Sequence, residues 1–364
     1  MNLGHLRRLT DDAGILQHAR YGLVSRDHGY ATDDNARALL FTALADAAGT
    51  AIAPRELALL RKLQPVYLSF VDHAFDPGGG DFRPFMGFSR TWEDAKRSED
   101  ADGRALWGLA ACAAGSFDSG LQRAASELFA RALPRAAEFG SPRAWCFALL
   151  AIDCCRQGGA DSGEPERVQR LLAERLQRRF VDEATAEWPW PEHALTYDNA
   201  RLPQALISAG RSLGEASMVD TGLRGLEWLL EVQLESGVLA PVGNDGWYPR
   251  GGVKARFDQQ PLEAQAMAEA CRDAYRATGD ARWRRGALVA ANWFLGANVS
   301  RRRVHDPASG GCHDALTPDG LNENMGAEST LAWLSTQLVL AELAPRPRRP
   351  GARHGMRRIH AGTK

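Results

Sequence analysis

Two adjacent acids and an amide stand at the head of an apolar helical pattern near the start of the chain. Asp33, Asp34 and Asn35 are followed by alanine or leucine at positions 36, 39, 40, 43, 44 and 47, a spacing that predicts a helix beginning at the polar residues. Helix capping or the helix dipole explains one such acid. Capping leaves the second acid without a role, so the pair indicates a site for acid–base chemistry or for binding hydroxyl groups.

The same arrangement, acids followed by an arginine in the first helical turn, returns twice along the chain. It occurs at 99–104 (EDADGR) and again at 198–201 (DNAR), and weaker versions begin at 142, 258 and 324. A cation in the first turn opposes the helix dipole. We therefore expect Arg37, Arg104 and Arg201 to pair with neighbouring carboxylates.

These polar-headed helices, rich in alanine and glycine, alternate with more amphipathic and charged segments. The amphipathic segments lie near 11–22, 55–73, 121–139, 166–181, 216–235 and 281–297. Six helical pairs suggest an open solenoid or a closed ring. Because the polar loops all precede the presumed inner helices, we predict the ring, an all-α (α/α)6 toroid that forms one domain over 1–343. The tail 344–364 is basic, lacks apolar periodicity and is expected to be disordered.

Composition limits the partners and the compartment. The formal net charge is -1 and 45% of the residues are hydrophobic, which argues against recruitment of nucleic acid and allows a sizeable core. The chain shows neither a secretory leader nor an apolar run long enough to span a membrane. Its six cysteines lack C-x-x-C spacing. We expect reduced thiols and a cytoplasmic protein.

A ring of helical hairpins would bring the inner-helix starts together at one end, where acids could be divided by their surroundings. Glu192 lies in a loop of tryptophans and prolines at 187–193. Desolvation there would keep its proton at neutral pH, so we predict that Glu192 is a general acid. Asp34 and Asp102, at helix starts, are predicted to act as a base or as ligands of sugar hydroxyls.

The aromatic side chains in these loops indicate a carbohydrate cleft, because the apolar faces of sugar rings stack on aromatic rings. A single tryptophan could equally be a buried loop anchor. The predicted substrate-binding residues are Asp33, Asn35, Asp100, Trp92, Trp188, Trp190, His193, Asp198, Asn199, Trp247, Tyr248, Arg250, Gln260, Glu263, Asn324 and Glu328. No histidine spacing indicates a metal and no glycine-rich loop indicates a nucleotide, so we predict neither metal nor cofactor.

Five longer motifs resemble a bacterial six-hairpin glycosidase-like domain, found alone or fused C-terminally to retaining glycosyltransferases. They lie at 5–12, 30–39, 196–206, 257–264 and 322–330, and the resemblance extends to about Leu343. It implies a toroid that works on carbohydrate, with a glycosyltransferase as a possible partner. It does not imply glycosyltransferase activity, since the chain lacks the βαβ patterning of sugar-nucleotide domains.

Three functions are compatible with these sequence patterns. The leading hypothesis is a glycoside hydrolase or phosphorylase that uses paired carboxylates on an oligosaccharide or glycoconjugate. The alternatives are a cofactor-independent sugar epimerase, with His193 or His313 in proton transfer, and a non-catalytic carbohydrate-binding partner of a glycosyltransferase. Sugar, linkage and stereochemical outcome are not determined by these patterns.

Overall fold

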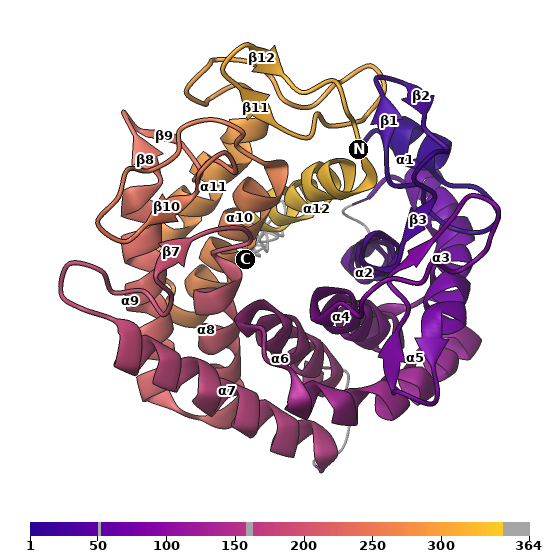
Figure 1. Ribbon diagram of the computed structural model, residues 1–364, viewed down its shortest axis with the longest axis horizontal. Helices are drawn as coiled ribbons and strands as arrows, with labels where there is room; N and C mark the ends of the chain where they lie inside the picture. Colours follow the sequence, from indigo (N-terminus) through magenta and orange to yellow (C-terminus); the bar gives the residue numbers. More distant parts are fainter. Residues whose placement is uncertain (50–51, 158–162, 345–364) are drawn as a thin grey trace, which may run out of the picture.

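Six helices form an inner ring around a central axis (Figure 1). The computed structural model describes residues 1–49, 52–157 and 163–344. The inner helices are α2 (Thr32–Ala48), α4 (Glu99–Gly115), α6 (Pro142–Gln157), α8 (Arg201–Leu213), α10 (Pro261–Thr278) and α12 (Ala327–Leu343). Each begins at or directly after one of the predicted polar starts, which confirms the inner half of the repeat.

A second layer of helices surrounds this ring and confirms the (α/α)6 toroid (Figure 1). It consists of α3 (Pro54–Ala74), α5 (Ser119–Ala132) with the short 3₁₀ helix η2 (Leu133–Glu138), α7 (Glu164–Glu183), α9 (Ala216–Val232) and α11 (Ala281–Phe294). The outer helices carry the amphipathic patterns, because one face packs on the ring and the other meets solvent.

The helix expected near 11–22 is not formed, and that prediction was wrong. Asp11 accepts hydrogen bonds from the backbone of Ala13 and Gly14, which closes a turn. The next amide, of Ile15, donates to the side chain of Asn35 instead of to its own segment. The short helix α1 (Gly4–Leu9) packs against α12 at this position of the ring.

Small residues let the inner helices approach closely. A Cβ on Gly108 of α4 would lie only 2.6 Å from the carbonyl oxygen of Ala36 on α2. Glycine is required there because the two helix backbones are in contact. The abundance of alanine and glycine on the inner helices therefore has a packing cause.

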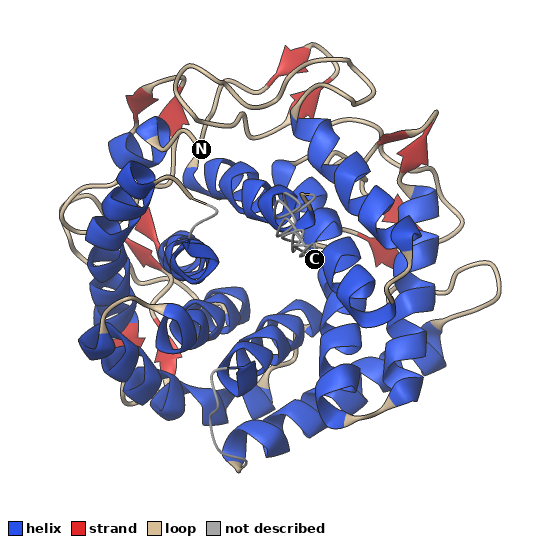
Figure 2. Ribbon diagram, turned by 180° about the vertical axis from the view of Figure 1, so that it is seen from behind, coloured by secondary structure: helices blue, strands red, loops and turns tan. Residues whose placement is uncertain are grey.

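In the described part of the chain, twelve two-residue strands lie in the loops that lead from an outer-layer segment to the next inner helix (Figure 2). They pair antiparallel as β1 (Ala19–Arg20) with β2 (Leu23–Val24), β3 (Tyr30–Ala31) with β6 (Phe85–Met86), β4 (Phe75–Asp76) with β5 (Asp81–Phe82), β7 (Ala194–Leu195) with β10 (Tyr248–Pro249), β8 (Leu234–Glu235) with β9 (Val238–Leu239), and β11 (Leu316–Thr317) with β12 (Gly320–Leu321).

These long loops meet at the end of the ring where the inner helices begin. The described connections at the other end are short, such as 116–118, 214–215 and 279–280. Loops of this length on a helical scaffold are where binding residues gather. The fold thus places the candidate site at the end that carries the inner-helix starts.

The sequence predicts that the chain has no membrane span and that its C-terminal tail is disordered. Within the described ranges no helix combines the length and hydropathy that a membrane span requires. The tail predicted to be disordered falls, apart from Ala344, outside the described residues. The cytoplasmic location stays a prediction.

Candidate active site

The starts of α2 and α12 bring three carboxyl groups onto one guanidinium. Nη2 of Arg37 lies 2.5 Å from Oε2 of Glu328 and 3.4 Å from Oδ2 of Asp33, and its Nε lies 4.0 Å from Oδ1 of Asp34. The N-cap of α2 is Ala31, without a side-chain cap, so neither aspartate is there to cap the helix. The ion pairs predicted for Arg37 are confirmed.

The charges in this cluster favour a retained proton, because one guanidinium balances only one carboxylate. Burial, together with the neighbouring Asp33, raises the pKa of Asp34 well above its ordinary value, and Arg37 opposes the shift only in part. Burial also raises the pKa of Glu328, again against Arg37. Asp34 is the more completely buried of these two acids and is where the proton is most favoured.

Two of the acids in this cluster keep contact with solvent. The side chain of Glu328 is 34% accessible, although burial of its carboxyl group raises its pKa. The side chain of Asp33 is 31% accessible. A molecule in the surrounding solvent can therefore reach this cluster.

A second cluster is centred on Asp198, in the turn before α8. Its carboxylate lies 2.6 Å from Nη2 of Arg104 and 3.2 Å from Nε of Arg201, and Arg201 also lies 2.5 Å from Glu269 of α10. Burial alone would raise the pKa of Asp198, but the charges of Arg201 and Arg104 more than offset it, and the pKa lies below its ordinary value. All these groups are buried, so this network ties α4, α8 and α10 together.

Glu263, in the first turn of α10, joins the second cluster. It accepts hydrogen bonds from the backbone N–H of Asp198 and, at 2.9 Å, from Nδ2 of Asn199. Burial, with Asp198 nearby, raises the pKa of Glu263 to about 7. The fold therefore brings together Asp198, Asn199 and Glu263 in a buried position that suits a structural role, and their predicted binding of substrate stays a prediction.

Glu192 forms an ion pair where a general acid was predicted. Its Oε1 lies 2.7 Å from Nη1 of Arg143, which also donates to the carbonyl oxygen of Tyr197 and to Thr196. The guanidinium holds Oε1 of Glu192 in the loop next to Thr196 and Tyr197. Tyr197 in turn donates its hydroxyl hydrogen to Asp100 at 2.7 Å, so Asp100 faces the same loop.

Comparison with known proteins gives a fold match only. The chain matches no protein-family model and no curated protein. The structure of cellobiose 2-epimerase from Bacillus thermoamylovorans B4167 superposes with a TM-score of 0.71 at 10% identity, covering 93% of this chain and 94% of that one. The fold is the six-hairpin glycosidase-like toroid.

Other solved toroids agree over most of their length. A sugar epimerase from a ruminal bacterium has a TM-score of 0.67 at 13% identity, covering 92% of this chain and 93% of that one. A family 76 glycoside hydrolase from a bovine Bacteroides thetaiotaomicron strain has a TM-score of 0.63 at 11% identity, with 92% and 73% covered. Toroids of this kind thus carry more than one reaction on sugars.

The aromatic loop residues of this toroid are mostly loop anchors. Trp188 and Trp190 are buried, Trp190 completely, and both rings pack against Trp228 with centroids 4.9 and 5.8 Å away. Tyr248 packs edge-on against Trp188 at 5.2 Å. No open ring face is left on either buried tryptophan, so the stacking predicted for them has no surface in this conformation. Trp92 and Trp247 are half-buried and keep part of their surface.

Several of the predicted binding residues use their side chains to hydrogen-bond or pair with loop residues. Asn35 bonds the backbone of Ile15 and Ala31, and Arg250 donates to Thr185 and to the carbonyl oxygen of Glu183. The side chain of His193 is 81% exposed and lies 3.6 Å from Glu183. The remaining predicted positions lie in loops before α10 and α12: Gln260, Asn324 and His313.

Asp102 points away from both clusters. It accepts a hydrogen bond at 2.8 Å from the backbone N–H of Phe82 in β5, between α4 and the outer layer. Burial raises the pKa of Asp102 to about 7, against the Phe82 hydrogen bond, and nearby Asp81 adds to the shift. The structure does not bring Asp102 together with Asp34 or Glu192.

We expect Asp102→Asn to stabilise the protein at alkaline pH. An acid whose pKa is raised by folding carries no penalty below its unfolded pKa, a growing penalty as pH rises to the folded value, and the full penalty above it. Asparagine removes the charge and can still accept from Phe82. Urea unfolding should show a free energy of unfolding higher by on the order of 2 kcal/mol near pH 8 and little changed near pH 4. The expected gain is about half of what the full pKa shift corresponds to, because the loop can relax around the charge. An equal effect at both pH values would contradict the assignment.

Sequence reasoning missed four residues that border these clusters: Arg143, Glu269, Asp314 and His18. Arg143 stands in the first turn of α6 and Arg37 in the second turn of α2, and this likeness could have revealed Arg143. Glu269 lies inside a helix and Asp314 and His18 lie in loops, so no local pattern marks them. Within the described part of the chain no group of three or more histidine, cysteine, aspartate or glutamate side chains has a metal-binding arrangement. Independence from metals and cofactors stays a prediction.

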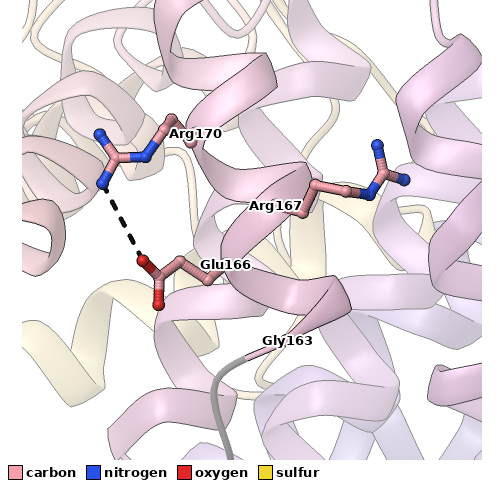
Figure 3. Close-up of a pocket in the computed structure, with 4 residues that line it drawn as sticks. All are labelled: Gly163, Glu166, Arg167 and Arg170. Atoms are coloured by element: carbon pink, nitrogen blue, oxygen red, sulfur yellow. Dashed lines mark ion pairs between the residues drawn. The ribbon is translucent and has the colours of Figure 1, made fainter.

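Two hollows elsewhere on the toroid do not coincide with these clusters. One, of about 360 Å³, lies on the outer surface at the start of α7, where Arg170 pairs with Glu166 at 3.9 Å and Arg167 points to the other side of the helix (Figure 3). The other, of about 600 Å³, lies at the opposite end of the ring between the ends of α6, α8 and α10. Neither contains the acids of α2 or α12.

Proposed function

We propose that this protein is a carbohydrate-active enzyme that cleaves a glycosidic bond in an oligosaccharide or glycoconjugate by general acid–base catalysis. Asp34 is the general acid and Glu328 its partner carboxylate. The observation that carries the proposal is the cluster in which Asp34, Asp33 and Glu328 share Arg37, with Asp33 and Glu328 partly accessible to solvent. Paired acids with different surroundings are the requirement of this chemistry.

The roles follow from the surroundings of each carboxyl group. Asp34, whose pKa burial and Asp33 raise well above its ordinary value, gives its proton to the departing glycosidic oxygen as the bond to the anomeric carbon breaks. Glu328, oriented by Arg37, takes the proton of the water that adds to that carbon. If phosphate adds in place of water, the same groups run a phosphorolysis. Asp33 contributes negative charge near a transition state that carries positive charge on the sugar.

A sugar epimerase is the second candidate, and one observation favours it. The epimerase structures match over 92–94% of their own length with TM-scores of 0.67 to 0.71, whereas the glycoside hydrolases match over 72–88% of theirs with TM-scores of 0.56 to 0.63. Epimerisation also needs an acid and a base, and Asp34 and Glu328 would serve it. The glycosyltransferase partner and the purely carbohydrate-binding role stay predictions.

The proposal is tested by incubating the purified protein with manno-, gluco- and galacto-oligosaccharides in D₂O, with and without phosphate, and reading products by mass spectrometry and NMR. Shortened products are expected, and their dependence on phosphate separates hydrolysis from phosphorolysis. Deuterium on a sugar carbon without cleavage would replace this proposal by the epimerase. Saturable binding without any product would support the binding role, and neither product nor binding would contradict all three.

A further inference from the structure

The segment 15–19 spans the space between the starts of α2 and α12. Ile15 donates its backbone N–H to Oδ1 of Asn35, next to Asp34 in α2, at 2.9 Å. Gln17 accepts from the backbone N–H of Ala327, next to Glu328 in α12, at 2.9 Å. His18 is therefore carried between the two helix starts that bear the proposed acids.

Hydrogen bonds around His18 select one form of its ring. Oδ1 of Asn324 accepts from the backbone N–H of Ala19 at 3.0 Å, so the amide nitrogen of Asn324 is the donor side. That nitrogen contacts a carboxylate oxygen of Asp314 and lies 2.8 Å from Nδ1 of His18. Nδ1 must accept this bond, which places the ring proton of a neutral imidazole on Nε2.

The charges that face His18 leave the ring neutral at pH 7. Burial lowers the pKa of His18, Asp314 opposes that shift, and the ring of His28, 4.7 Å away, adds to it. Asp314 also lies close enough to Asp34 and Glu328 to raise the pKa of both. His18, Asp34 and Glu328 are thus all within the electrostatic reach of Asp314.

We propose that His18 is a substrate-binding residue of this site, a neutral imidazole that donates the hydrogen on Nε2 to an oxygen of the sugar. The inference rests on the proposed function. Within the described residues the hydrogen bond of the His18 ring is the one at Nδ1, and the side chain is half-buried, so the donor on Nε2 is free for a ligand. A site that donates to a hydroxyl or carbonyl discriminates against sugars that lack that oxygen.

The state of the ring is measured first, without any substrate. Long-range ¹H–¹⁵N correlation spectra of the whole protein at pH 7 should show His18 as the Nε2–H tautomer. Asn324→Leu removes the amide donor and should let the two tautomers mix, while His28→Gln, which removes the neighbouring exposed ring, should raise the pKa of His18 slightly and leave its Nε2–H tautomer unchanged. An Nδ1–H tautomer or a charged ring in the wild type would overturn the proposal.

Kinetics then test the contact with the sugar, using the oligosaccharide that the wild type converts. His18→Ala should lower kcat/KM by roughly tenfold or more, since a hydrogen bond to substrate is lost. His18→Gln, which restores an N–H donor, should recover part of the loss, and His28→Gln should lose nothing. Conversion that is indifferent to His18 would overturn this inference alone. A wild type that neither converts nor binds any sugar would overturn the proposed function and this role together.

Discussion

Asp34→Asn lowers turnover by about 10²- to 10⁴-fold while the helical ring stays folded, because an amide fills the same space but cannot donate the proton. The wild-type rate should fall on the alkaline side, as Asp34 loses the proton that burial and Asp33 hold in place. That alkaline limb should be absent from the residual rate of the variant. Steady-state kinetics between about pH 5 and pH 9, with circular dichroism for the fold, measure both effects.

Asp46→Asn is the matched control for this substitution. Asp46 is a buried acid near the other end of the same helix, where it pairs at 2.8 Å with Arg61 of α3. Its loss should cost stability without changing the turnover of the folded protein. Equal activity losses in Asp34→Asn and Asp46→Asn would show that damage to α2, and not loss of a proton donor, explains the result.

Asp198→Asn should destabilise the protein by about 3–5 kcal/mol, because it leaves two buried guanidinium groups short of a counter-charge. Arg104 would lose its ion-pair partner, and Arg201 would keep only Glu269. Since folding lowers the pKa of Asp198, its stabilisation is present above the unfolded pKa and is lost as pH falls through the folded value. The gap between wild type and variant should therefore shrink in acid.

Urea unfolding near pH 7 and near pH 2.5, below the ordinary pKa of an aspartate, measures this difference. Glu166→Gln is the control, because Glu166 pairs with Arg170 at 3.9 Å on the exposed surface of α7 and should change stability by less than about 0.5 kcal/mol. If Asp198→Asn lowered the free energy of unfolding no more than Glu166→Gln, the buried network would not be holding α4, α8 and α10 together.

The sequence by itself determined the features that depend on neighbours along the chain. Helical periodicity and small residues specified the inner helices. Apolar residues spaced at 3.6 positions lie on one face of a helix, and that face has to be buried. The pairing of Arg37 with Asp33, four residues earlier, follows from helix geometry alone. The residues at 11–22 also show a helical pattern when only their neighbours along the chain are considered. They do not form a helix, and the backbone N–H of Ile15, which would donate within a helix, donates to the side chain of Asn35.

Only the tertiary structure decided which acids meet and which of them keep a proton. Glu328 reaches Arg37 from the far end of the chain, and Arg104 reaches Asp198 across 94 residues, because closing the ring brings these helix starts together. Glu192 was expected to be desolvated and neutral, but Arg143 stands beside it. Burial and through-space charge set protonation, and neither quantity exists until distant segments have packed.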